Sequence, residues 1–73
     1  MVSNCLWVMF DGEDESFILA PTLRDALHQW KEKVAGFINE DYASEGIDRQ
    51  ISAEEITDPE SVSLVATPDQ LLF

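Results

Sequence analysis

The sequence is poor in cysteine, histidine and glycine, and this scarcity excludes several classes of protein. Its 73 residues include one cysteine, one histidine and three glycines. A single cysteine cannot form an intramolecular disulfide, so a disulfide-stapled secreted scaffold is excluded. The three glycines are isolated and form no phosphate-binding loop. A serine-nucleophile motif of the G-x-S-x-G kind is also absent.

A long apolar run is missing as well. Acidic residues within 11–15 interrupt the apolar run near the N-terminus, which is far shorter than the roughly 20 residues that span a bilayer. No basic segment precedes this run, so we expect no signal peptide. The expected location is the cytoplasm.

Positively charged residues are scarce. Lysine and arginine total 4 against 15 aspartates and glutamates, which gives a formal net charge of −11. Nucleic acid and anionic membranes repel such a chain, whereas basic surfaces attract it. Arg24, His28 and Lys31 align at helical spacing, but this short stripe sits in a strongly negative molecule. We therefore expect no direct binding to nucleic acid or to a membrane.

Residues 22–45 are predicted to form one long helix, because apolar side chains recur there at steps of three and four. Thr22 and Asp25 have the spacing of an N-terminal capping box. Gly46 suits the left-handed position that follows a helix. Gly36, inside the helix, indicates a close approach of another segment or an earlier helix end. The apolar positions are Leu23, Ala26, Leu27, Trp30, Val34, Phe37, Ile38 and Tyr42.

Several strands are predicted around this helix. Residues 3–10 have apolar side chains on both faces, which is typical of a central strand or of one covered on both faces. Residues 16–20 are the expected return strand of a hairpin with an acidic loop. Residues 47–51 alternate apolar and polar side chains and are expected to form a short edge strand. Residues 61–66 are the expected last strand.

Two short helical pieces complete the prediction. Ser52 and Glu55 repeat the capping-box spacing, so residues 53–57 are expected to form a single turn. Thr67 and Pro68 are typical of a helix start. The element order ββαββ predicts a small two-layer α+β sandwich, in which an antiparallel sheet packs on one long helix. Residues 1–73 are expected to form one domain.

The residues that could carry catalysis are few. His28 and Cys5 are the only histidine and thiol, and nothing in their sequence surroundings supports a catalytic pair. We therefore expect a protein that is not an enzyme and uses no cofactor. The acidic loop of residues 11–15 could offer carboxylate oxygens to Ca²⁺ or Mg²⁺. It lacks the twelve-residue spacing of an EF-hand, so we interpret it as a solvated loop without metal.

The acidic side chains form three groups in loops and at the ends of elements. The first is the hairpin loop: Asp11, Glu13, Asp14 and Glu15. The second follows the end of the long helix: Glu40, Asp41, Glu45 and Asp48. The third precedes the last strand: Glu54, Glu55, Asp58 and Glu60. Clustered carboxylates repel one another and cost stability, so this placement favours a use such as binding or solubility.

Spaced carboxylates can imitate the phosphates of nucleic acid, and a protein that grips nucleic acid with Lys and Arg would bind them in a fast, salt-sensitive way. Small, strongly acidic chains of this kind resemble phage-encoded inhibitors of host defence nucleases, the anti-restriction and anti-CRISPR proteins. The resemblance rests on size, charge and architecture, and it carries over no residue. Our hypothesis is a DNA mimic that blocks a larger protein with a basic surface, in the host cytoplasm if a phage encodes it. The predicted contacts are Asp11, Glu13, Asp14, Glu15, Glu40, Asp41, Tyr42, Glu45 and Asp48.

A second hypothesis makes the chain a structural or assembly module, such as a homodimer, whose acidic surface serves solubility alone. Its interface would be apolar and would use the long helix or an open sheet edge at residues 47–51. The two hypotheses differ in their response to salt. Salt should weaken a mimic's affinity steeply, whereas an apolar dimer should hardly respond.

Overall fold

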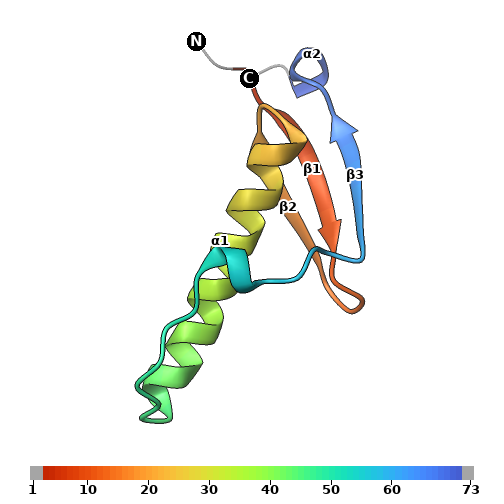
Figure 1. Ribbon diagram of the computed structural model, residues 1–73. Coiled ribbons are helices and arrows are strands. Elements are labelled where there is room, and N and C mark those ends of the chain that lie inside the picture. The colour runs from red at the N-terminus through yellow and green to blue at the C-terminus, as the bar shows by residue number, and fades with distance from the viewer. Residues whose placement is uncertain (1–2, 72–73) are drawn as a thin grey trace.

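The computed structural model describes residues 3–71, which contain a three-stranded antiparallel sheet (Figure 1). The strands are β1 (Cys5–Phe10), β2 (Glu15–Ala20) and β3 (Ser61–Ala66). β1 lies in the middle and pairs with both neighbours, in the order β2-β1-β3. The predictions of a central first strand, a hairpin return strand and a last strand at residues 61–66 are therefore confirmed.

The long helix α1 (Leu23–Ser44) packs on β2 and β1, which makes the molecule a two-layer α+β fold, as predicted. Side chains alternate along a strand, so the pairing register places Trp7 and Met9 on the face that also carries Ile18 and Ala20. This face meets the helix. The indole nitrogen of Trp7 donates a hydrogen bond to the Ala20 carbonyl at 3.0 Å. The buried cluster consists of Met9, Ile18, Ala20, Ala26 and Trp30.

The C-terminal cap of α1 is as predicted, and at the N-terminal end the structure shows the Thr22 half of the predicted capping box. The hydroxyl of Thr22 accepts a hydrogen bond from the Asp25 N–H at 3.2 Å. At the other end, Gly46 has a φ of 75°, and the Ile47 N–H donates to the Tyr42 carbonyl at 2.8 Å. This is the Schellman ending, in which a left-handed residue turns the chain back over the last helical turn.

Residues 47–51 do not form a strand, so that prediction is wrong. They run back along α1 as an extended segment outside the sheet (Figure 1), and the order is ββαβ instead of ββαββ. The side-chain amide of Asn39 holds this segment. Its nitrogen donates to the Ile51 carbonyl at 3.0 Å, and its oxygen accepts from the Ile51 N–H at 2.8 Å. These bonds satisfy the backbone groups that a strand partner would otherwise use.

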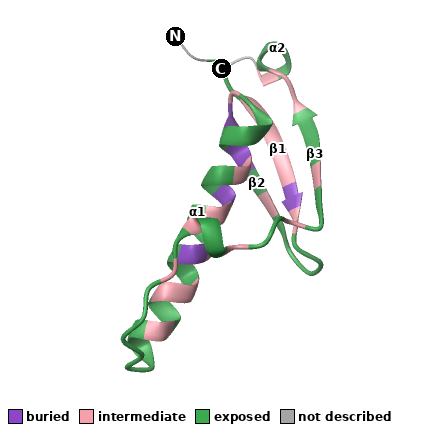
Figure 2. Cartoon of the chain, viewed as in Figure 1, coloured by how far each residue is buried: buried purple, intermediate pink, exposed green. Residues whose placement is uncertain are grey.

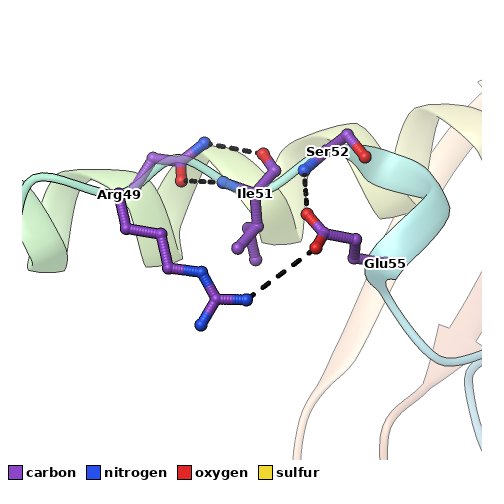
Figure 3. Close-up of polar contacts among 5 residues, drawn as sticks. Arg49, Ile51, Ser52 and Glu55 are labelled. Carbon is purple, nitrogen blue, oxygen red and sulfur yellow. Dashed lines mark hydrogen bonds and ion pairs between the residues drawn. The ribbon is translucent and has the colours of Figure 1, made fainter.

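A single turn, η1 (Ala53–Glu55), follows this segment, as predicted. The Glu55 carboxylate accepts from the Ser52 N–H at 2.8 Å and lies 3.8 Å from the Arg49 guanidinium (Figure 3). The short helix α2 (Pro68–Leu71) begins after Thr67, also as predicted. It packs at the end of the sheet where β1 begins and β3 ends (Figure 1).

The C-terminal part of α1 projects beyond the sheet. The buried residues of α1 are Ala26, Trp30 and Ala35, and every residue of the helix after Ala35 is half-buried or exposed (Figure 2). The molecule measures 46 × 28 × 19 Å and has a radius of gyration of 14.1 Å. A compact domain of this length would have about 11 Å. The fold is therefore elongated, and the end of α1 lies far from the core.

The helix continues through Gly36, so neither an earlier end nor a close approach explains this glycine. No heavy atom lies within 4 Å of the position that a Cβ at Gly36 would occupy. We expect Gly36→Ala to raise the free energy of unfolding by about 0.5 to 1 kcal/mol, because alanine costs less backbone entropy in a helix. Urea unfolding followed by circular dichroism measures this change.

Gly46→Ala is the matched control for this prediction. The positive φ of Gly46 strains any residue with a Cβ, so we expect a loss of about 1 kcal/mol there. Equal effects of the two substitutions, or a loss at Gly36, would contradict the helix as described.

The hydrogen bonds of Asn39 generate a second prediction. Asn39→Ala removes both bonds to Ile51 and should lower the free energy of unfolding by about 1 to 3 kcal/mol. The Ile51 amide should also exchange its hydrogen faster, which NMR in D₂O measures. Glu40→Ala, an exposed neighbour, should change stability by less than about 0.5 kcal/mol. Unchanged exchange at Ile51 in the Asn39 variant would show that other contacts hold the segment.

Candidate functional site

The predicted contact residues fall into two groups, of which the first is the hairpin tip (residues 11–15). The Asp11 carboxylate accepts hydrogen bonds from the N–H groups of Glu13 and Asp14, each at 2.8 Å. This is the local bonding by which aspartate stabilises a turn. Asp11, Glu13, Asp14 and Glu15 are all exposed, so the turn presents their carboxylates to solvent.

Glu60 belongs to the hairpin tip in space, although sequence reasoning assigned it to another group. Its N–H donates to the Phe10 carbonyl at 2.7 Å. A Cβ placed at Gly12 would lie 2.9 Å from a Glu60 carboxylate oxygen. The signal was present in the sequence, because a strand that pairs antiparallel with β1 must begin beside the end of β1. The tip therefore carries five carboxylates.

The second group, the helix exit, consists of Glu40, Asp41, Glu45 and Asp48, with Tyr42 among them. The four carboxylates are exposed and Tyr42 is half-buried. They surround the C-terminal end of α1, where the helix dipole is already negative, and no basic residue lies in the last turn. Anionic side chains are unfavourable at this end of a helix. The electrostatics of the fold therefore oppose this arrangement.

Of the third sequence group, Glu54, Glu55 and Asp58 have contacts within the fold. Asp58 forms an ion pair with Lys31 at 2.5 Å, and Glu55 lies 3.8 Å from Arg49. Hydrogen bonds from its own backbone N–H and from the Ser52 side chain lower the pKa of Glu54. By contrast, no ion pair within residues 3–71 involves a carboxylate of the hairpin tip or of the helix exit.

The structure does not bring the two groups together. The hairpin tip lies at the end of the β1–β2 turn, whereas the helix exit lies at the far end of the projecting helix (Figure 1). The sheet and α1 diverge between them, and the long dimension of the molecule is 46 Å. The predicted contacts thus form two separate acidic projections, called the acidic ends below: the end of α1 and the end of the β1–β2 hairpin (Figure 1).

The candidates for catalysis stay apart as well. His28 is exposed, and its Nε2 lies 2.9 Å from the Glu32 carboxylate. It lines an open groove of about 780 Å³ between α1 and η1, to which Cys5 does not belong. Arg24 and Lys31 line the same groove together with Asp25 and Glu54, so its charges balance and it offers no basic site for an anion. Within residues 3–71, no three or more His, Cys, Asp or Glu side chains are arranged so that they could hold a metal ion together.

Comparison with protein-family models, with curated proteins and with solved structures gives no match to this chain. Of the helices in residues 3–71, none combines the length and the apolar character that crossing a bilayer requires.

The hairpin tip generates a prediction about pH. Hydrogen bonds from the backbone of Asp14 and then of Glu13 lower the pKa of Asp11 below its ordinary value of 3.8. Because folding lowers this pKa, the carboxylate stabilises the fold above the unfolded-state pKa, and the contribution is lost as pH falls through the folded-state value. An NMR titration of the Asp11 carboxyl should therefore give a midpoint below 3.8.

Asp11→Asn is the matched variant, because an asparagine side chain can accept the same two hydrogen bonds without titrating. It should fold as the parent chain does, and its melting temperature should fall less steeply below about pH 4. A midpoint of 3.8 or higher would mean that the two backbone bonds do not form in solution.

Proposed function

We propose that this protein is a non-enzymatic binding protein whose acidic ends occupy a basic, nucleic-acid-binding surface on a larger protein. The observation that carries the proposal is the contrast between two kinds of carboxylate. Those of the third sequence group largely have partners inside the fold, such as Lys31 for Asp58. Those of the hairpin tip and the helix exit are exposed and have no ion-pair partner among residues 3–71.

The energetics of the fold support this proposal. Like charges gathered at one turn repel one another, and the carboxylates of the helix exit also face the negative end of the helix dipole. Neither group offsets this cost through an ion pair within residues 3–71. The positive charge of a basic partner would offset the repulsion among the carboxylates and their unfavourable interaction with the helix dipole. Few internal ion pairs would compete with the partner for these carboxylates.

The elongated shape supports a mimic of nucleic acid in particular. A body 46 Å long and 19 Å across in its thinnest dimension, with carboxylates at one end of its length and on the hairpin tip that projects beside it (Figure 1), can lie along a groove that binds a nucleic-acid backbone. Lys and Arg of that groove would pair with carboxylates in place of phosphates. The further proposal, an inhibitor of a host defence nuclease of the anti-restriction or anti-CRISPR kind, rests on the resemblance in size and charge.

A charge reversal tests the proposal. The wild-type chain is immobilised, proteins captured from a cell lysate are identified, and duplex DNA is added as a competitor. We expect the captured proteins to be nucleic-acid-binding proteins. Duplex DNA should displace them, and they should dissociate from the immobilised chain as salt rises from about 50 to 500 mM. A variant with Asp14, Glu15, Glu40 and Asp41 changed to Lys should lose this binding while it keeps the circular dichroism spectrum of the fold.

The control has the same change of charge at other exposed positions: Asp25, Glu32, Glu54 and Asp69 changed to Lys. Each reversal adds two charges, so both variants move from −11 to −3. The control should keep at least part of the binding, since both acidic ends are intact. Binding retained by the first variant, or lost equally by both, would show that the two acidic ends are not the contact surface.

An assembly module is the second candidate function, because one face of the sheet is apolar and the long helix does not cover it. Phe17 is 61% exposed and Leu19 is 48% exposed. The edge at residues 47–51 cannot serve such an interface, because that segment is not part of a sheet. An apolar interface would use the sheet face itself.

A further inference from the structure

The open face, defined here by Leu6, Val8, Phe10, Phe17 and Leu19, is the side of the sheet that faces away from α1. The register pairs Leu6 with Leu19 and Val8 with Phe17 across β1 and β2. These residues alternate with Trp7, Met9 and Ile18, which belong to the core under the helix. The central strand thus carries apolar side chains on both faces, but the long helix covers only one of them.

The area of the molecule shows how much surface is left to bury. Its solvent-accessible surface is 5411 Å², whereas a compact monomer of 8.2 kDa would expose about 4,500 Å². The surplus of about 900 Å² is close to the roughly 800 Å² that each partner buries in a stable protein–protein interface. Part of the surplus is the acidic helix exit, which repels a second copy. The open face contributes two of the exposed large apolar side chains, Phe17 and Leu19.

Charge limits where a second copy could approach. The strand residues opposite β1 on the β3 side of the open face are Ser61, Ser63 and Ala66, which are uncharged. Glu15, opposite Phe10, is the charged strand residue of this face, and it belongs to the hairpin tip at one end of the face. In a molecule with a net charge of −11, this is therefore the broad surface on which two copies can meet without apposing carboxylates.

We propose that the open face binds the open face of a second copy of this chain and forms a symmetric dimer. Two apolar sheet faces pack at a separation of about 10 Å with interdigitating side chains, and a two-fold axis makes one patch complementary to itself. The helices then lie on the two outer sides, so the assembly has four layers. Each sheet gains the second cover that an apolar central strand requires.

Electrostatic repulsion selects the orientation of the two copies. A two-fold axis parallel to the strands would place both hairpin tips at one end, where ten carboxylates would meet, five from each tip. An axis in the plane of the interface and across the strands places the tips at opposite ends. The second arrangement is favoured, because the repulsion between the tips falls with their separation.

Sedimentation velocity on the wild-type chain, from about 1 to 300 µM, tests the proposal. We expect a transition from monomer to dimer in this range, which corresponds to a micromolar dissociation constant. The variant Phe17→Glu with Leu19→Glu should raise that constant at least about 100-fold, because it places charges at the centre of the interface. Both side chains are exposed in the monomer, so the variant should keep its circular dichroism spectrum.

The matched control is Phe37→Glu with Ile47→Glu, since these residues are 58% and 43% exposed and lie at the projecting helix end. It adds the same charge and should dimerise as the wild type does. A wild-type chain that stays monomeric throughout this range would overturn the proposal. So would a dimer that the Phe37 and Ile47 variant disrupts and the Phe17 and Leu19 variant does not.

Two further measurements need no disruption of the face. An apolar interface alone should hardly respond to salt, but each copy carries a net charge of −11. Raising NaCl from about 20 to 500 mM should therefore tighten the dimer, because salt screens the repulsion between two acidic copies. A dimer that salt dissociates would overturn the proposal.

A cysteine cross-link tests the orientation of the two copies. In a Cys5→Ser background, Glu13→Cys should form no disulfide across the dimer on oxidation, because the tips lie at opposite ends. A cross-linked dimer would overturn the proposed orientation.

This dimer deepens the second candidate function, the assembly module, and does not rest on the proposed binding to a basic protein; the experiments separate the two. Charge reversal at the acidic ends should leave dimerisation intact or strengthen it, since it reduces the repulsion between copies. Substitution of the open face should leave the exposed carboxylates in place. Failure of one proposal is therefore visible without failure of the other.

Discussion

Burial of Trp30 and Ala26 of α1 against Met9, Ile18 and Ala20 of the sheet is the interaction on which the rest of the structure depends. Six residues are buried in the described chain, and five of them belong to this cluster. A chain of this size forms only a small core, so the described chain depends on this cluster. The cluster fixes the first part of α1 over β1 and β2, and this placement sends the rest of the helix past the edge of the sheet. The separation of the two acidic ends is a consequence of that one contact.

The elements that could be predicted from the sequence are those whose signals are local. The caps at Thr22 and Gly46, the spacing of apolar residues in α1 and the turn after Phe10 all lie within a few residues of the structure they specify. Residues 47–51 show where local signals fail. Their alternation is typical of a strand, but Ile51 bonds to Asn39, 12 residues earlier in the chain. An asparagine side chain can replace a strand partner, and no periodicity reveals that it does.

For the candidate site, too, the sequence predicts some features and not others. The exposure of the predicted carboxylates follows from their place in turns and at a helix end, and the structure agrees for all of them. Whether they converge depends on the angle between helix and sheet, which side-chain packing at Trp30 and Met9 decides. The membership of Glu60 in the hairpin tip follows from strand pairing instead, because β3 must start beside the end of β1. Groups of carboxylates that are close in the sequence therefore predict that these side chains are exposed. They do not predict whether the groups lie on one surface of the folded chain.

The acidic ends and the open face occupy different parts of the molecule, and this separation has a physical consequence. An apolar face surrounded by repulsive charge can associate only where the charges keep apart, so the carboxylates restrict the geometry of any dimer as well as the choice of a partner. A basic protein bound at the acidic ends would neutralise the repulsion that opposes dimerisation. Binding at the ends and association through the face would then be positively coupled, since each lowers the electrostatic cost of the other. The net charge opposes compact folding when the chain is alone. In the proposed assembly it would couple partner binding at the acidic ends to dimerisation through the open face.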